Sequence, residues 1–322
     1  MLKKIAESIR TNKNILEKKE LNPIIKFIDS HSFKNKSRIY SDIGEDSAAI
    51  KHNDSLILLT TDRIRTEFIE NYPYGAGFSA ILVSVDDIYA CGGTPIAASL
   101  IISFREEQTG RKILEGVCEA SKKFNVPIIR GHTNTDSTNY ELSSTIIGEI
   151  KREDYISAGN AQINDAIILA VDFDGIVGKA SKYYFDTTTF KSSEEVLRKR
   201  KAMNEIATAH IAHSSKDVSN GGIFGTILQL IKYSDVGADI NINKIVIPPN
   251  LIELNYTLEM YIKMYLTTSF ILTAPSKNCE KIIDIFKKFD IYANMIGKII
   301  KPKNLLRIND GRVNKTLDVL RF

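Results

Sequence analysis

The chain has 322 residues, of which 43% are hydrophobic and 25% charged, and at about 100 to 200 residues per domain it predicts two globular domains. Its 43 basic and 39 acidic residues are spread along the whole chain, so the formal charge of +4 indicates no nucleic-acid-binding face. Three widely spaced cysteines fit no disulfide framework or Cys-x-x-Cys zinc site. No apolar run reaches the roughly 18 residues that cross a bilayer. Together these observations predict a cytoplasmic protein without a membrane partner.

The first 40 residues are predicted to form a lysine-rich helical lead-in in which we see no chemistry, and Pro23 is well placed to open a short helix there. Residues 47–50 and 55–61 follow as predicted strands, because β-branched and apolar residues cluster between polar turn residues. The run 76–90 is too long for a strand and too apolar for a surface helix, so it predicts a buried helix. The remaining elements of this half are strands at 96–104, 126–130 and 143–150 and a helix at 113–124.

A charged stretch from 151 to 164 is a predicted linker. We place the domain boundary near residue 157, so that the first domain covers 1–156 and the second covers 157–322. The second half is predicted to be α+β as well, with a strand at 166–171, helices at 194–210, 222–232 and 279–289, a glycine-rich turn at 220–222, and strands at 238–242 and 268–273.

Two adjacent carboxylates, Asp86 and Asp87, lie in the apolar helix at 76–90. Burying them unpaired would cost several kcal/mol, so at least one needs a cation or hydrogen-bond donors. Consecutive helical positions differ by about 100°, so at most one of the two should reach deep into a site. The alternative is that one caps a neighbouring backbone group and the other is solvated.

Further polar turns lie at the ends of predicted strands: Gly44-Glu45-Asp46, Thr61-Asp62 and Gly131 to Asp136. Each taken alone is compatible with an ordinary structural turn. In the third turn, Asp136 is a better metal ligand than His132, since Mg²⁺ prefers carboxylate oxygen to imidazole. Together they favour an Mg²⁺ site that carries nucleotide phosphates, and the predicted metal ligands are Asp46, Asp62, Asp87 and Asp136.

No Gly-x-x-x-x-Gly-Lys-Ser/Thr or Gly-x-Gly-x-x-Gly segment exists, so the P-loop and dinucleotide-binding folds are excluded. The remaining glycine-rich turn runs from Ser215 to Gly222, directly before a predicted helix. Its backbone amides could attract phosphate at the helix N-terminus, or Asn220 could simply cap the helix. Both interpretations stay open.

These motifs resemble, in order and spacing, those of the AIR synthase superfamily. Gly44-Glu45-Asp46 is similar to its Gly-Asp-Asp turn, Thr61-Asp62 to its Thr-Asp pair, and 84–93 to its Asn-x-x-Asp-Ile-x-Ala-x-Gly-Ala helix, which aligns Asp87 with the family's aspartate. Residues 131–136 resemble the Gly-Gly-His-x-x-Asp turn of selenophosphate synthetase, and 216–222 resemble the Asp-x-Ser/Thr-x-Gly turn of the second domain.

The resemblance implies a PurM-like α+β fold with two domains, in which a four-stranded N-terminal sheet pairs across a homodimer into a barrel. It also implies that ATP lies in a cleft with its phosphates held through Mg²⁺, and that Lys216 and Asp217 are catalytic. The residues implied to contact ATP are Gly44, Asp46, Thr61, Asp62, Gly131, His132, Thr133, Asn220 and Gly221.

The segment 184–192 most resembles a Trp-Asp-Thr-Thr-Thr segment of an uncharacterised AIR synthase-related branch that includes methanogenesis marker protein two. This similarity predicts Asp186, Thr187 and Thr188 as contacts to a small-molecule substrate. The alternative is a β-branched strand and loop without such contacts.

The resemblance does not define the reaction. Asn220 stands where thiamine-monophosphate kinase has a second aspartate, and no Cys or selenocysteine followed by lysine precedes Gly44, as selenophosphate synthetase requires. We therefore expect an Mg²⁺-dependent, ATP-using enzyme that phosphorylates or activates a small metabolite. The alternatives are a thiamine-monophosphate kinase-like enzyme and a nucleotide-binding regulatory or assembly subunit with negligible turnover.

Overall fold

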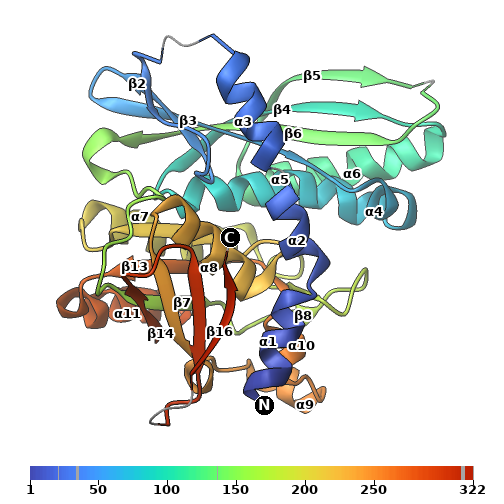
Figure 1. Ribbon diagram of the computed structural model, residues 1–322. Helices are drawn as coiled ribbons and strands as arrows, with labels where there is room; N and C mark the ends of the chain where they lie inside the picture. Colours follow the sequence, from blue (N-terminus) through green and yellow to red (C-terminus); the bar gives the residue numbers. More distant parts are fainter. Residues whose placement is uncertain (21, 34–35, 136, 313–315, 322) are drawn as a thin grey trace.

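The computed structural model describes residues 1–322 except 21, 34–35, 136, 313–315 and 322. Two α+β domains are stacked on one another, the first above the second in the view of Figure 1, which confirms the predicted fold class. The lead-in forms the helices α1 (Leu2–Arg10), α2 (Lys13–Glu20) and α3 (Asn22–His31), which run along one side of both domains (Figure 1).

The first domain contains a six-stranded sheet rather than the four strands that the resemblance implied. The strands are β1 (Ile39–Ser41), β2 (Ala48–His52), β3 (Ser55–Arg63), β4 (Thr94–Ser103), β5 (Ile128–Asn134) and β6 (Glu141–Lys151). They are arranged in the order β1-β2-β3-β6-β4-β5, and only β4 and β5 pair in parallel. The helices are α4 (Thr66–Asn71), α5 (Pro73–Ala90) and α6 (Glu107–Phe124).

Helix α5 is the predicted buried helix, and it is enclosed because it lies between the sheet, α6 and the second domain. Two glycines let α5 and α6 approach closely. A Cβ at Gly77 would lie 2.0 Å from the carbonyl oxygen of Ile113, and a Cβ at Gly116 would lie 2.0 Å from that of Tyr74. The helix is therefore fixed rigidly, with its C-terminal half directed toward the second domain.

The second domain is built on a seven-stranded sheet in the order β10-β13-β7-β14-β11-β15-β16, with a small sheet β12-β9-β8 beside it. The large sheet comprises β7 (Ala166–Val171), β10 (Ser214–Asp217), β11 (Gly237–Asn241), β13 (Ser269–Ala274), β14 (Tyr292–Ile300), β15 (Leu305–Asn309) and β16 (Thr316–Arg321), and the small one β8 (Ile176–Val177), β9 (Tyr184–Asp186) and β12 (Tyr265–Leu266). The helices are α7 (Ser193–Thr208), α8 (Gly222–Tyr233), α9 (Pro249–Glu253), α10 (Leu258–Tyr261) and α11 (Cys279–Lys288), with short 3-10 helices at Arg152–Asp154, Ile242–Lys244 and Ser276–Asn278.

One continuous hydrophobic core joins the two domains. It contains Ile146 of the first sheet, Val85 of α5, Met203 of α7 and Phe270 of β13. Because side chains alternate along a strand, Ile271 points to the opposite face of the second sheet and belongs to a separate core. The edge strand β10 of the second domain's sheet therefore lies against α5, the buried helix of the first domain.

The second core also includes the lead-in. Ile5 and Ile9 of α1, which contacts β16, β15 and α10, are buried there, and so is Ile15 beside Gly225 of α8. Burial of an isoleucine side chain contributes about 1.5 to 3 kcal/mol, so α1 is docked firmly on the second domain. The start of the predicted lead-in thus packs on the second domain, whereas β1 at its end pairs with β2 of the first.

The face of the first sheet that α5 and α6 do not cover carries exposed apolar side chains. Leu59 of β3 and Ile101 of β4 are 37% and 46% exposed, while their strand neighbours Leu58 and Leu100 are buried on the other face. We find in the described part of the chain no helix with the length and hydropathy that a bilayer crossing needs.

Candidate functional site

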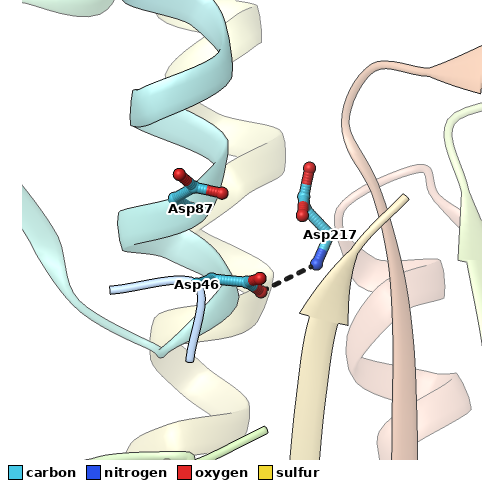
Figure 2. A group of neighbouring side chains, drawn as sticks. All are labelled: Asp46, Asp87 and Asp217. Carbon is cyan, nitrogen blue, oxygen red and sulfur yellow. Dashed lines mark hydrogen bonds between the residues drawn. The ribbon is translucent and has the colours of Figure 1, made fainter. Parts of the chain in front are cut away.

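Three aspartates from three separate elements meet where the domains touch. Asp46 follows the turn before β2, Asp87 lies in the last turns of α5, and Asp217 ends β10. One carboxylate oxygen of each lies within 4.8 Å of the other two, and Figure 2 shows the three side chains facing a common space. Asp46 and Asp87, both predicted metal ligands, are thus joined by Asp217, which we had assigned to catalysis.

The turn that delivers Asp46 depends on Gly44. Its φ is +109°, a conformation that residues with a side chain rarely adopt, and a Cβ there would lie 2.5 Å from Cδ1 of Tyr233. Gly44 is therefore needed to bring the turn against α8. The fold therefore requires glycine at position 44 whether or not this residue contacts ATP as predicted.

Lys216 and Asp46 form an ion pair across the domain boundary. Their side chains are 5% and 4% exposed, and the backbone N–H of Asp217 donates to the second oxygen of Asp46 at 3.1 Å. Burial alone would lower the pKa of Lys216, but the carboxylates of Asp46 and Asp217 outweigh it and raise that pKa. Lys216 is thus a charged group that holds Asp46 in place, rather than a free base.

Asp87 and Asp217 are less well compensated. Thr60 Oγ1 donates a hydrogen bond to Asp87 Oδ2 at 2.5 Å. Burial raises the pKa of Asp87 well above its usual value, and repulsion from Asp62 and Asp217 adds to this. Burial and repulsion from Asp46 likewise raise the pKa of Asp217. Carboxylates crowded in this way are stabilised by a bound cation.

Asp62 lies near Asp87 but is not part of the group formed by Asp46, Asp87 and Asp217. Ser84 Oγ of α5 donates to Asp62 Oδ2 at 2.8 Å, and the same hydroxyl lies 2.9 Å from Ser144 Oγ. Asp62 lines the cavity described below and contributes to the raised pKa of Asp87. Its neighbour Thr61 is exposed and contacts Thr145 Oγ1 at 3.0 Å, so the two residues of the predicted Thr-Asp pair point in different directions.

A cavity of about 510 Å³ opens beside the aspartates. Its walls combine carboxylates, cationic side chains and tyrosines from both domains. The carboxylates include Asp62, Asp87 and Asp217, the cations Arg63, Arg65 and Lys263, and the tyrosines Tyr72, Tyr183, Tyr184 and Tyr265. The cavity is large enough for a small-molecule ligand and has charges of both signs on its walls.

The predicted turn at 131–136 is not brought to the aspartates within one chain. Gly131, His132 and Thr133 lie in the exposed edge strand β5. Gly131 is in the same row of the sheet as Asp62, but β6 and β4 lie between their strands, which separates them by roughly 14 Å. Asp136 lies outside the described residues.

The structure contradicts one of the two interpretations of the turn from Ser215 to Gly222. The N-cap of α8 is Gly221, and Asn220 makes no capping bond, so Asn220 as the cap was wrong. Asn220 instead lines the cavity, and its carbonyl oxygen accepts a hydrogen bond from Asn14 Nδ2 at 2.8 Å. Gly222 has a φ of +64°, and a Cβ there would lie 2.2 Å from the carbonyl oxygen of Ile262.

The segment predicted to contact substrate is buried. Asp186, Thr187 and Thr188 are 4%, 1% and 0% exposed. Asp186 Oδ1 accepts hydrogen bonds from the backbone N–H groups of Thr188 and Thr189 at 2.8 and 3.0 Å, while Thr187 bonds to Thr267. These side chains support the loop from within, and it is Tyr184, just before them, that reaches the cavity.

The lead-in supplies a residue that the sequence analysis missed. Lys18 of α2 donates to Ser219 Oγ at 2.8 Å and to Gln229 Oε1 at 2.5 Å, both in the second domain next to Asp217. Burial, with repulsion from Lys216, lowers the pKa of Lys18 to about 8. No local motif marks it, because its partners are about 200 residues away in sequence.

Comparison with known proteins agrees with this arrangement. Models of the AIR synthase related protein family match residues 44–150 with the N-terminal domain and residues 162–307 with the C-terminal domain. An uncharacterised protein of Methanocaldococcus jannaschii is 34% identical over 96% of this chain and 94% of its own length. A thiamine-monophosphate kinase of Buchnera aphidicola is 28% identical over 87% of this chain and 90% of its own. The chain belongs to the AIR synthase related family.

Solved structures show the same fold. PurL of Thermotoga maritima in complex with ATP superposes with a TM-score of 0.71 at 12% identity, covering 90% of this chain. This chain spans about half of that PurL chain, 48%. AaThiL in complex with AMPPCP and TMP superposes with a TM-score of 0.68 at 20% identity, over 94% of this chain and 98% of its own.

Proposed function

We propose that the protein is an Mg²⁺-dependent enzyme that uses ATP to phosphorylate or otherwise activate a small metabolite. The observation that carries this proposal is the convergence of Asp46, Asp87 and Asp217 beside the cavity between the domains. Membership of the AIR synthase related family supports it, since thiamine-monophosphate kinases and selenide, water dikinases are among the relatives.

The donor set fits Mg²⁺. Three carboxylates offer oxygens within 4.8 Å of one another, and Mg²⁺ prefers oxygen ligands. Burial and repulsion from nearby carboxylates raise the pKa values of Asp87 and Asp217, and a bound cation would offset both effects. Asp46, Asp87 and Asp217 would hold the ion, which when bound would neutralise and orient phosphate oxygens.

The chain's own residues would position the reacting groups. Lys216 and the backbone N–H of Asp217 fix the carboxylate of Asp46, and Thr60 fixes that of Asp87. Phosphoryl transfer depends mainly on positioning and charge neutralisation, so a fixed carboxylate set is the main requirement. The cationic and aromatic wall of the cavity would hold the remainder of the ligands and limit the access of water.

Thiamine-monophosphate kinase activity is a second candidate. The near full-length similarity to the kinase of Buchnera aphidicola and the fold shared with AaThiL favour it. Asn220, where we expect that enzyme to have an aspartate, speaks against it. Phosphorylation of thiamine monophosphate by the purified protein, measured directly, decides between the two.

We also propose a homodimer formed through the open face of the first sheet. Leu59 and Ile101 leave apolar area exposed there, and the edge strand β5 is exposed along its whole length. Proteins usually cover or pair such surfaces. A partner copy would bury this face, as the resemblance implied.

A metabolite screen tests the proposed function. The protein with Mg²⁺ and ATP is incubated with pools of phosphorylated and carboxylated metabolites, and release of ADP or phosphate is measured. Turnover that depends on one pool supports an enzyme. A protein that binds ATP but stays silent with every pool, including thiamine monophosphate, would instead be a regulatory or assembly subunit.

A further inference from the structure

The N-terminal segment is attached to the second domain before it reaches the site. Ile5 and Ile9 of α1 are buried in the core of that domain, and Arg10 Nε donates to the carbonyl oxygen of Val319 at 2.8 Å. The position of α2 is therefore determined by a docked helix rather than by a free chain end.

Helix α2 then bridges the two walls of the cavity. Asn14 Nδ2 donates to the carbonyl oxygen of Asn220 in the second domain at 2.8 Å. Arg65 of the first domain donates to Asn14 Oδ1 at 3.0 Å and to Glu17 Oε2 at 2.6 Å. Asn14, Arg65 and Asn220 all line the cavity, so α2 forms one of its borders.

Lys18 lies one turn further along α2 and contacts Ser219, two residues after Asp217. Its ammonium group donates to two neutral oxygens, Ser219 Oγ and Gln229 Oε1. An ammonium group has three N–H donors, so one remains for another acceptor. In the described part of the chain, no carboxylate lies within ion-pair distance of Lys18, although Asp46, Asp87 and Asp217 act on it electrostatically.

The site needs such a cation. Three carboxylates suit a metal ion, but a phosphate that shares this ion also meets their negative charge. Lys216 already forms an ion pair with Asp46, so its charge is shared with that carboxylate. Lys18 is close to the same carboxylates, is held by neutral groups that can release it, and has its third donor unassigned.

We infer that Lys18 binds a phosphoryl oxygen at the aspartate site, and that α2 serves to place it there. This inference rests on the proposed function. The phosphoryl group belongs either to the nucleotide or to a phosphorylated second substrate. A charged hydrogen bond of this kind is worth roughly tenfold or more in affinity.

The alternative role for Lys18 is to fasten α2 to α8 through Gln229. The two roles predict different effects when Lys18 is replaced by a neutral residue. If Lys18 only fastens the helix, Lys18→Met lowers the stability and weakens every ligand together. If it binds phosphate, Lys18→Met weakens phosphate ligands, while Mg²⁺ alone binds as well as before or more tightly, because a positive charge near its carboxylates has been removed.

The test is calorimetric titration of the full chain with Mg²⁺ alone, Mg–AMPPCP, Mg–ADP, and orthophosphate added to the Mg–ADP complex. Lys18→Met is compared with Lys18→Arg, which keeps the charge, and with Lys13→Met, which removes an exposed lysine from the same helix. We expect Lys18→Met to weaken at least one phosphate ligand about tenfold, with Lys18→Arg within about threefold of wild type and Lys13→Met unchanged.

The pattern identifies the phosphate. Loss with Mg–AMPPCP alone assigns the terminal phosphate of ATP, equal loss with Mg–ADP assigns a phosphate common to both nucleotides, and loss confined to orthophosphate assigns the second substrate. Wild-type affinity of Lys18→Met for all three phosphate ligands, or a parallel loss of Mg²⁺ binding and stability, overturns the inference. Failure of the wild-type protein to bind any nucleotide contradicts the proposed function instead.

Discussion

Arg200 of α7 and Asp86 of α5 form a buried ion pair that links the two domains. Arg200 Nε donates to Asp86 Oδ1 at 2.7 Å, and the side chains are 0% and 3% exposed. The guanidinium group also donates to the carbonyl oxygen of Val196 at 3.1 Å and lies over the ring of Phe124. Asp86 is therefore paired within the protein, which leaves Asp87 as the carboxylate of α5 that faces the site.

Breaking this pair on one side should be costly. Asp86→Asn leaves the Arg200 charge buried without its partner, and we expect a loss of about 3 to 5 kcal/mol in the free energy of unfolding. The double variant Asp86→Asn with Arg200→Met should recover part of this loss. Urea unfolding of Asp86→Asn, Arg200→Met, the double variant and Lys201→Met, an exposed neighbour, measures it. Simple addition of the two single-variant losses would show that the residues are not coupled.

The aspartate site should lower the stability of the protein without metal. Asp87→Asn removes a half-buried charge that Asp62 and Asp217 repel, so we expect a higher melting temperature than wild type in chelator. Stabilisation by Mg²⁺ with ATP should be lost in this variant. Differential scanning calorimetry with and without Mg–ATP measures both effects, and Asp284→Asn, an exposed aspartate, is the control. A lower melting temperature in chelator would contradict the assignment of Asp87 as an uncompensated charge.

The same carboxylates predict a dependence of stability on pH. The folded-state pKa values of Asp87 and Asp217 are raised above the unfolded value of about 3.9, so the folded protein binds more protons than the unfolded chain. Their contribution to the free energy of unfolding therefore falls as the pH rises from about 4 through the raised pKa values, and is constant above them. Other groups also titrate, so the measured quantity is the difference between wild type and Asp87→Asn.

We expect Asp87→Asn to gain stability over wild type as the pH of metal-free urea unfolding is raised from 5 to 8. Saturating Mg²⁺ should stabilise wild type more than Asp87→Asn, because the metal binds the deprotonated carboxylates. Most of the variant's gain in stability should then disappear. A difference between the two proteins that does not change with pH argues against the raised pKa of Asp87.

The open face of the first sheet should carry the dimer contact. Ile101 is 46% exposed on that face, so Ile101→Glu should give a monomer by sedimentation equilibrium, while the wild type sediments as a dimer. Ile176→Glu is the matched control, because Ile176 is 48% exposed on β8 of the second domain. A monomeric wild type, or a dimer that Ile101→Glu leaves intact, contradicts this surface as the interface.

Local sequence patterns predicted the elements and part of the site. The apolar run around Asp86 and Asp87 indicated a buried helix, and in keeping with the rotation of about 100° between neighbours, Asp87 lies in the aspartate group while Asp86 pairs with Arg200. The strand ends correctly placed Asp46 near Asp87. These successes rest on periodicity and turn chemistry, which act over a few residues.

The remaining features depend on contacts between distant segments. Nothing near Lys18 indicates that Ser219 and Gln229 will meet it, and nothing near Asp86 names Arg200 as its partner. The glycine turn at 131–133 has the composition of a binding loop, yet strand order places it at the sheet edge. Strand order is set by tertiary packing, which periodicity does not encode.

The central claim is that Asp46, Asp87 and Asp217 bind a nucleotide through Mg²⁺. Isothermal titration of AMPPCP into the wild-type protein, in Mg²⁺ and again in excess chelator, tests it most directly, with Asp217→Asn titrated in Mg²⁺ beside it. We predict binding by wild type in Mg²⁺, loss of that binding in chelator, and loss in Asp217→Asn even with Mg²⁺ present. Equal binding of AMPPCP in Mg²⁺ and in chelator, or full binding by Asp217→Asn, would contradict the claim.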